Sequence, residues 1–144
     1  MKKFILPALF ILLAFTAIFY ARHPLTTTVQ IRGHVFAVDV AVTEEEKQKG
    51  LGYRDSLPEN SGMLFPYGHK ERYGYWMKGM RFPIDIIWIE DNLIADISKN
   101  VPVAVSGTLP SYAPSKPVNK VLELNAGTAD RIGAKIGDLV IIHN

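Results

Sequence analysis

The sequence predicts a mainly β domain of the α+β class. We expect a small closed or half-closed antiparallel β-barrel with two short helices, preceded by one N-terminal hydrophobic helix. Residues 26–144 contain seven or eight short stretches with strand composition and only two with helix signals. The stretch from Ile84 to Ile89 is apolar on both strand faces apart from Asp85, which is typical of a strand buried on both sides. About 120 residues suffice for one core without disulfides or metals.

The N-terminal segment, residues 1–25, differs in kind from the rest of the chain. Two lysines precede 18 uncharged residues, Phe4–Ala21. That length is marginal for a membrane span, which needs about 20 residues, and long for a signal-peptide apolar region of about 7–15. Cleavage after Ala21 or after Ala17 would put a phenylalanine at the −3 position, where a small residue is required.

These features favour an uncleaved signal anchor over a cleaved signal peptide. The positive-inside rule keeps the two lysines in the cytoplasm, so residues 26–144 are predicted to be exported. The predicted partner is then the cytoplasmic membrane, contacted through residues 4–21. Cleavage would instead release a secreted or periplasmic domain.

Charge and cysteine content exclude several classes of function. Removing Lys2, Lys3 and Arg22 from the 16 basic residues leaves 13 against 14 acidic ones, a net charge of about −1. This balance lacks the basic surface of a nucleic-acid binder. The absence of cysteine excludes disulfide scaffolds and thiolate zinc sites. The four histidines have no ligand spacing, so we expect no metal and no cofactor.

The first half of the domain carries clear local signals. Residues 26–33 and 34–42 read as two strands around a tight turn at Arg32-Gly33. Thr43 and Glu46 form a capping box for a short helix over residues 44–49, and Gly50 is its C-cap.

Further along the chain, residues 63–65 form a strand that Pro66 is expected to stop, followed by a polar loop over 67–72. Residues 73–78 read as a strand, and residues 84–90 and 93–98 as a hairpin around Asp91-Asn92. Four prolines make residues 100–117 a long loop, a kind that is often functional or mobile.

The C-terminal part of the domain is predicted to contain two more strands and the second helix. The strands cover residues 118–124 and 139–142. Between them, Asn125 is expected to cap a short helix that ends near Ile132.

Six blocks of sequence together are specific, although each is weak alone. They are Lys49–Arg54, Gly62–Phe65, Trp76–Lys78, Pro83–Ile87, Val121–Gly127 and Gly137-Asp138. In this order they resemble the bacterial and archaeal family called domain of unknown function 192. The resemblance implies a small barrel-like β fold with short helices, often exported, and implies no activity. Two positions depart from the family pattern: Gly52 replaces a usual methionine, and Gly79-Met80 a usual Asn-Thr.

Asp85 is the strongest anomaly, because a carboxylate among isoleucines is costly to bury unpaired. It must meet a cation or backbone amides, and Lys78, Arg81 and Arg54 are the candidate cations. The structural interpretation is a buried ion pair or a hydrogen-bonded strap between strands, and this is the favoured one. The functional interpretation is an acid or ligand anchor in a cleft.

The other candidate ligand-binding residues are Trp76, Lys78, Tyr112, Arg54 and Glu123. Trp76 and Lys78 share one strand face, where a ring beside a cation would suit a sugar. The favoured interpretation, however, is that Trp76 packs in the core while Lys78 extends to water. Tyr112 lies in the proline-rich loop, where exposed aromatic residues favour binding. Glu123 shares a face with Val121, yet strand alternation favours the solvent side.

Three functions remain open. The first is a non-enzymatic envelope module that binds a glycan or a peptide. The alternative is a hydrolase or lyase acting on an envelope glycan, with Asp85 and Glu123 as paired carboxylates. The third is a structural domain without a ligand site, in which Lys78 and Asp85 pair and are sealed from solvent. No nucleophile elbow or phosphate-binding glycine loop supports another class of enzyme.

Overall fold

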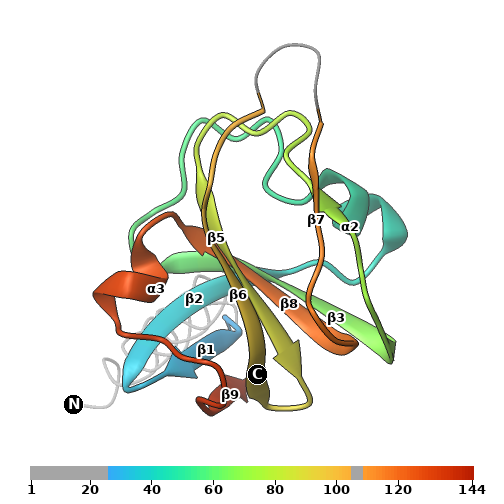
Figure 1. Cartoon of the computed structure of the whole chain (residues 1–144). Helices are drawn as coiled ribbons and strands as arrows, with labels where there is room; N and C mark the ends of the chain where they lie inside the picture. The colour runs from blue at the N-terminus through green and yellow to red at the C-terminus, as the bar shows by residue number, and fades with distance from the viewer. Residues whose placement is uncertain (1–25, 105–108) are drawn as a thin grey trace, which may run out of the picture.

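A curled β-sheet forms the body of the protein (Figure 1). The computed structural model describes residues 26–104 and 109–144, so the expected N-terminal helix lies outside the described residues. The elements, in chain order, are β1 (Thr28–Ile31), β2 (His34–Val40), α2 (Glu44–Lys49), β3 (Ser61–Glu71), β4 (Tyr75–Trp76), β5 (Ile84–Glu90), β6 (Leu93–Val101), β7 (Ser111–Tyr112), β8 (Val118–Asn125), α3 (Thr128–Arg131) and β9 (Val140–His143). No helix in these two described ranges is long and apolar enough to cross a membrane.

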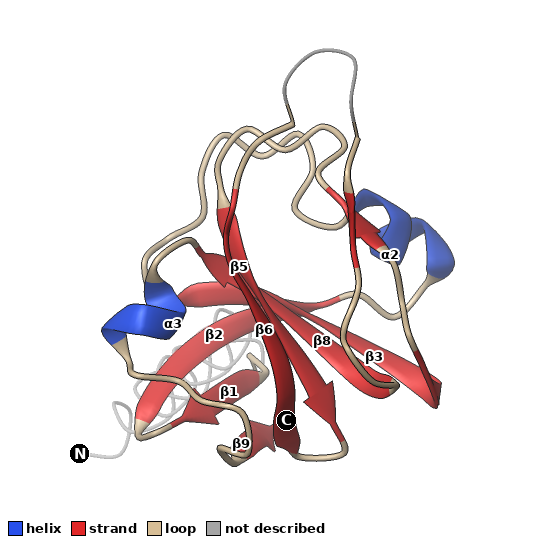
Figure 2. Ribbon diagram, in the orientation of Figure 1, coloured by secondary structure: helices blue, strands red, loops and turns tan. Residues whose placement is uncertain are grey.

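Seven strands make the main sheet in the order β6-β5-β8-β3-β2-β1-β9, and β4 pairs with β7 in a separate ribbon. The sheet curls until its two edges meet at one end (Figure 2). There Leu93 bridges Leu139, and the Ile94 amide donates to the Asp138 carbonyl at 2.9 Å. The mainly β, half-barrel prediction is confirmed.

Several details of the strand prediction are wrong. The strand predicted at 73–78 covers only Tyr75–Trp76, and β7 lies within the predicted loop over 100–117. Strands β2 and β3 pair in parallel, because the chain crosses over through α2 and a long connection before β3 begins. Strand β3 also continues through Pro66 instead of stopping there. Because β2 pairs with β3 only as far as Leu64, β3 has a free edge at Pro66, where a missing amide costs no ladder hydrogen bond.

The predicted local signals are present around α2. The Thr43 hydroxyl accepts from the Glu46 amide at 3.2 Å, and the Glu46 carboxylate accepts from the amides of Thr43 and Val42, both at 2.8 Å. Gly50 ends the helix with φ 50° and ψ −136°, a conformation that a residue with a Cβ adopts only under strain. Helix α2 is therefore fixed at both ends, which positions the lysines of its last turn.

The second helix is capped differently from the prediction. Asn125 ends β8, and its side-chain amide donates to the carbonyls of Leu57 and Pro58 at 2.9 and 3.1 Å. The N-cap is Gly127, which has no side chain to accept a hydrogen bond. The donors at this helix end need another acceptor, and β5 supplies it, as described below.

Both faces of the sheet are covered, as the apolar run in β5 predicts. One hydrophobic cluster includes Phe36, Leu122 and the residues around α3. The other includes Phe65, Trp88 and buried residues of the connections, such as Leu51 and Met77. Six of the seven residues of β5 are buried. Polar side chains on β5 or β8 must therefore be satisfied inside the protein or open into a pocket.

Candidate functional site

Asp85 is fully buried and bound by backbone amides. Its Oδ1 accepts from the Asn100 amide at 2.8 Å, and its Oδ2 accepts from the Ala129 amide at 2.7 Å. The Asn100 amide is available to Asp85 because β6 bulges at this point and the regular pairing with β5 is interrupted. Ile84 pairs with Val101, whereas Ile86 pairs with Ser98. The carboxylate thus ties β6 and the uncapped start of α3 to β5, so the structure contains the hydrogen-bonded strap.

The cations considered for Asp85 lie elsewhere. Arg54 pairs with Asp39 at 2.8 Å, and Arg81 pairs with Asp55. Lys78 is exposed, with its Nζ 5.9 Å from the centre of the Trp76 ring. The sealed Lys78–Asp85 pair expected of a purely structural domain is therefore absent. Since Asp85 is saturated and does not reach solvent, we leave it out of the candidate site.

Glu123 points inward, contrary to the expected solvent side. It lies on β8 between Met63 of β3 and Ile86 of β5. Because β8 is a central strand with both faces covered, alternation does not bring Glu123 to solvent, and it is only 6% exposed. Its Oε2 has no hydrogen-bond partner among the described residues. An orphan buried oxygen of this kind is rare and requires an explanation.

The environment of Glu123 favours its protonated form. Burial raises the pKa of Glu123 to about 8, although a hydrogen bond from the Leu51 backbone and the charge of Arg54 both act to lower it. Burial also raises the pKa of the nearby Tyr75, whose hydroxyl lies 2.7 Å from that of Tyr67. At neutral pH Tyr67 and Tyr75 are uncharged and Glu123 is mostly protonated. Glu123 can therefore donate a hydrogen bond as well as accept one.

A pocket of about 50 Å³, here called the narrow pocket, opens beside Glu123. A Cβ added to Gly50 would lie 3.7 Å from the orphan Oε2, so the glycine backbone passes next to the carboxyl. The narrow pocket is lined by residues 47–51, Tyr75, Trp76, Lys78, Met80 and Glu123. Three lysines and one mostly neutral carboxyl therefore line the same pocket.

Trp76 forms part of the wall and remains 56% exposed. The favoured interpretation that Trp76 packs in the core is wrong, because Trp88 is the tryptophan buried there. The Trp88 ring meets Tyr75 edge-on at 5.4 Å, and its Nε1 donates to the Ser98 hydroxyl at 2.9 Å. Tyr112 is half-buried and pairs with Tyr75 across the β4–β7 ribbon, so both side chains lie on the same face of that ribbon.

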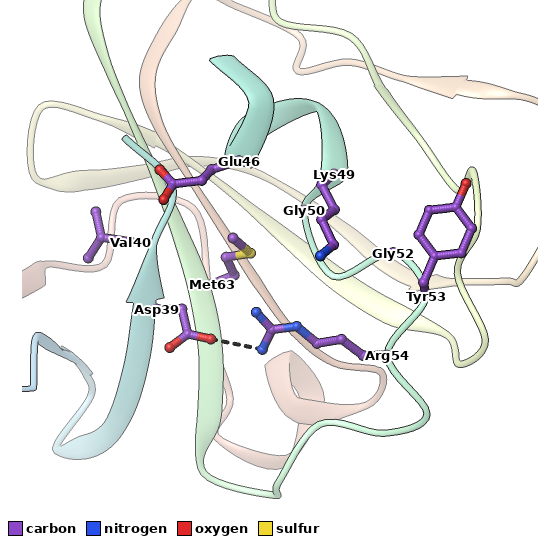
Figure 3. Close-up of a pocket in the computed structure, with 9 residues that line it drawn as sticks. All are labelled: Asp39, Val40, Glu46, Lys49, Gly50, Gly52, Tyr53, Arg54 and Met63. Atoms are coloured by element: carbon purple, nitrogen blue, oxygen red, sulfur yellow. Dashed lines mark hydrogen bonds and ion pairs between the residues drawn. The ribbon is translucent and has the colours of Figure 1, made fainter. Parts of the chain in front are cut away.

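A second hollow of about 470 Å³, here called the wide pocket, adjoins the first and shares Lys49 and Gly50 with it. It is lined by Asp39, Val40, Glu46, Lys49, Gly50, Gly52, Tyr53, Arg54 and Met63. Figure 3 shows the Asp39–Arg54 ion pair across it, with Lys49 extending toward the same space. Lys49 therefore stands between the two pockets.

Asp85 and Glu123 do not form a pair of catalytic carboxylates. Glu123 pairs with Ile86, the neighbour of Asp85, and consecutive strand residues point to opposite faces. The two carboxyls are therefore on opposite sides of the sheet. Within residues 26–104 and 109–144, no group of three or more His, Asp or Glu side chains has an arrangement that could hold a metal ion.

The two departures from the family pattern meet at the wall of these pockets. A Cβ on Gly52 would lie 2.8 Å from the Lys49 carbonyl, and one on Gly79 would lie 2.8 Å from the Tyr53 ring. The Tyr53 amide donates to the Gly79 carbonyl at 2.8 Å. Both glycines thus allow the segment after α2 to approach the one after β4, which brings Lys49 and Lys78 to the same pocket.

Lys49, Gly50 and Tyr75 are site residues that the sequence prediction missed. Lys49 and Gly50 stand within a family block, and a lysine directly before a helix-ending glycine was the available signal. No signal in the sequence pointed to Tyr75, because aromatic residues in alternating strands are usually part of the core.

Comparisons with known proteins place the chain in a family. The model of the family DUF192, described as "Uncharacterized ACR", matches residues 27–142. A crystal structure from Novosphingobium aromaticivorans DSM 12444, of a protein of unknown function, has a TM-score of 0.71 and 33% identity, covering 83% of this chain and 89% of that one.

A crystal structure from Sinorhizobium meliloti 1021, described as a putative transcription regulator, has a TM-score of 0.70 and 33% identity. It covers 81% of this chain and 91% of that one. No curated protein matches the sequence. Since the family model spans most of the sequence and all six blocks lie within the matched range, the chain belongs to the DUF192 family.

Proposed function

We propose that this protein is an exported, membrane-anchored module that binds a polar ligand in the narrow pocket. The observation that carries the proposal is the orphan Oε2 of Glu123, a buried polar atom without a partner among the described residues, on a side chain that lines the narrow pocket. Leaving such an atom unpaired costs about 1–3 kcal/mol. A ligand that makes the missing hydrogen bond would recover that cost.

The rim of the pocket indicates what kind of ligand fits. Trp76 offers an exposed ring beside the Lys78 ammonium. A flat ring next to a cation suits the face of a sugar or a short peptide that carries polar groups. A glycan or a peptide of the cell envelope meets this description.

Replacing Trp76 by alanine tests the proposal. The exposed ring contributes little to the core, so the variant should fold, whereas ligand affinity should fall about tenfold, or about 1.4 kcal/mol. The measurement is calorimetric titration of the full-length protein, in mild detergent, with envelope glycans and peptides. Ile136→Ala is a matched control, because Ile136 is also exposed and lies outside both pockets. Equal affinities of the Trp76→Ala variant and the wild type would refute this site.

The location of the module rests on the N-terminal sequence. Two lysines before an uncharged run of 18 residues support an anchor with the domain outside the cytoplasm. In cell fractionation, the protein should remain in the membrane after alkaline carbonate extraction and be accessible to protease from the outer side. Recovery in the cytosolic fraction would contradict the proposal.

A second candidate is a hydrolase or lyase acting on a glycan, with Glu123 alone as general acid. The raised pKa of Glu123, about 8, favours it, because an acid that remains protonated at neutral pH can donate to a leaving oxygen. Release of product from glycan substrates, abolished in Glu123→Gln, would support this candidate. If a glycan binds but is not turned over, the enzymatic candidate fails and the binding module remains.

A further inference from the structure

The charges around the narrow pocket indicate the chemical class of its ligand. Lys49 and Lys78 both line the pocket, and neither makes an ion pair with an acidic side chain among the residues that the structure describes. Lys47, in contrast, pairs with Glu44 at 3.1 Å and lies over the Tyr67 ring. The pocket therefore presents two unneutralised cations.

The buried carboxyl of Glu123 does not neutralise these cations at pH 7. Because burial raises the pKa of Glu123 to about 8, most of its carboxyl is protonated there. A site with two free ammonium groups and one neutral acid attracts an anion and also offers it a hydrogen-bond donor. A ligand cation would meet repulsion instead.

We propose that the narrow pocket binds the carboxylate of a sugar acid, with the sugar ring lying against Trp76. This inference rests on the proposed function and specifies its ligand. Glu123 would donate a hydrogen bond to one carboxylate oxygen of the ligand, and charge-assisted O–H···O⁻ hydrogen bonds of this kind are short and strong. Lys49 and Lys78 would balance the ligand charge.

The size of the pocket supports this placement. Its volume of about 50 Å³ exceeds the roughly 10–15 Å³ that one water molecule needs and is well below the roughly 150 Å³ of a cavity that holds benzene, so the pocket has room for a carboxylate but not for a ring. A ring attached to that carboxylate would remain at the mouth, where Trp76 is exposed. A carboxylate without a ring would lose this second contact.

Binding should depend on pH through Glu123. The titratable and charged groups around it are Lys47 and Lys49 of α2, Arg54, Tyr67 of β3, Tyr75 of β4, and Lys78. Strand β5 faces it with the apolar Ile86. The pKa values of both tyrosines are raised, so they remain neutral. At pH 9 about one tenth of Glu123 is still protonated, so affinity should fall about tenfold from its value at pH 6.5.

The test compares D-glucuronate, D-glucose and acetate as ligands of the full-length protein, by calorimetric titration at pH 6.5 and pH 9. Glucuronate should bind more tightly than either of the others, and about tenfold more weakly at pH 9. Lys49→Ala and Lys78→Ala should each weaken glucuronate binding severalfold, whereas Lys135→Ala, an exposed lysine outside both pockets, should not. In Glu123→Gln the ratio of the affinities at the two pH values should approach one.

Other outcomes would overturn the inference. Equal affinities for glucose and glucuronate would refute recognition of the carboxylate. Tighter binding of a peptide C-terminus than of glucuronate would refute the assignment of the ligand as a sugar acid. If a glycan or peptide binds with sensitivity to Trp76→Ala but glucuronate does not compete, the inference fails and the proposed function stands. If Trp76→Ala alters the binding of no ligand, both fail.

Discussion

Replacing Asp85 by asparagine is expected to lower the free energy of unfolding by about 2–4 kcal/mol. The wild-type carboxylate accepts from two backbone amides, those of Asn100 and Ala129, in a fully buried setting. Asparagine keeps one acceptor oxygen and turns a donor toward the other amide, so that amide loses its partner. Urea unfolding followed by tryptophan fluorescence measures the difference, because Trp88 is fully buried on the same strand as Asp85.

Asp96→Asn is the matched control. Asp96 also accepts from two amides, those of Ile97 and Ser115, each at 2.8 Å, but it is only half-buried. Water can replace the lost contact there, so the loss should be about 1 kcal/mol. Equal losses at the two positions would mean that the burial of Asp85 adds nothing, and the strap would not be the element that joins β5, β6 and α3.

The sequence predicts those parts of the fold that are determined by residues adjacent to one another along the chain. The capping box at Thr43, the turn at Arg32-Gly33 and the turn at Asp91 are each set by a few adjacent side chains. The full burial of β5 also follows from its own apolar composition. The parallel pairing of β2 with β3 was not predictable, because it depends on how a long connection crosses the sheet.

The candidate site was predicted only in part, for a related reason. Trp76, Lys78, Arg54 and Glu123 all lie at or near the two pockets, and each is recognisable as a polar or aromatic residue in an apolar setting. Which face of β8 carries Glu123 into the protein depends on whether β8 is central or peripheral, and one sequence does not reveal that. Asp85 looked similar to Glu123 in the sequence, but a bulge in another strand satisfies it.

Glu123→Gln is expected to make the protein more stable than the wild type at alkaline pH, by as much as about 5 kcal/mol. The pKa of Glu123 is about 8 in the folded state against 4.5 for an ordinary glutamate. The folded protein therefore binds this proton more tightly than the unfolded chain does. The stability that it contributes is complete below pH 4.5, declines as pH rises to about 8, and is constant above that. Each pH unit in this window is worth about 1.4 kcal/mol.

Glutamine carries no titrating proton, so the variant should lack this decline, and the difference in unfolding free energy between variant and wild type should grow from pH 4.5 to pH 8. Taking the difference cancels the groups common to both proteins. Glu46→Gln is a control of opposite sign, because hydrogen bonds from the Thr43 and Val42 backbone lower the pKa of Glu46. Its contribution to stability is present above pH 4.5 and is lost as pH falls below that value.

The contrast between the buried carboxyls of Asp85 and Glu123 explains what the Glu123→Gln experiment tests. Asp85 is satisfied by the chain and stabilises it, whereas Glu123 has an unpaired oxygen and lines a pocket with two lysines that make no ion pair. A group that costs stability in the free protein can be compensated by a ligand, and binding then raises the stability of the folded state. If the pH profiles of wild type and Glu123→Gln run parallel, Glu123 is already satisfied in the free protein. The main reason to place a ligand in the narrow pocket would then be lost.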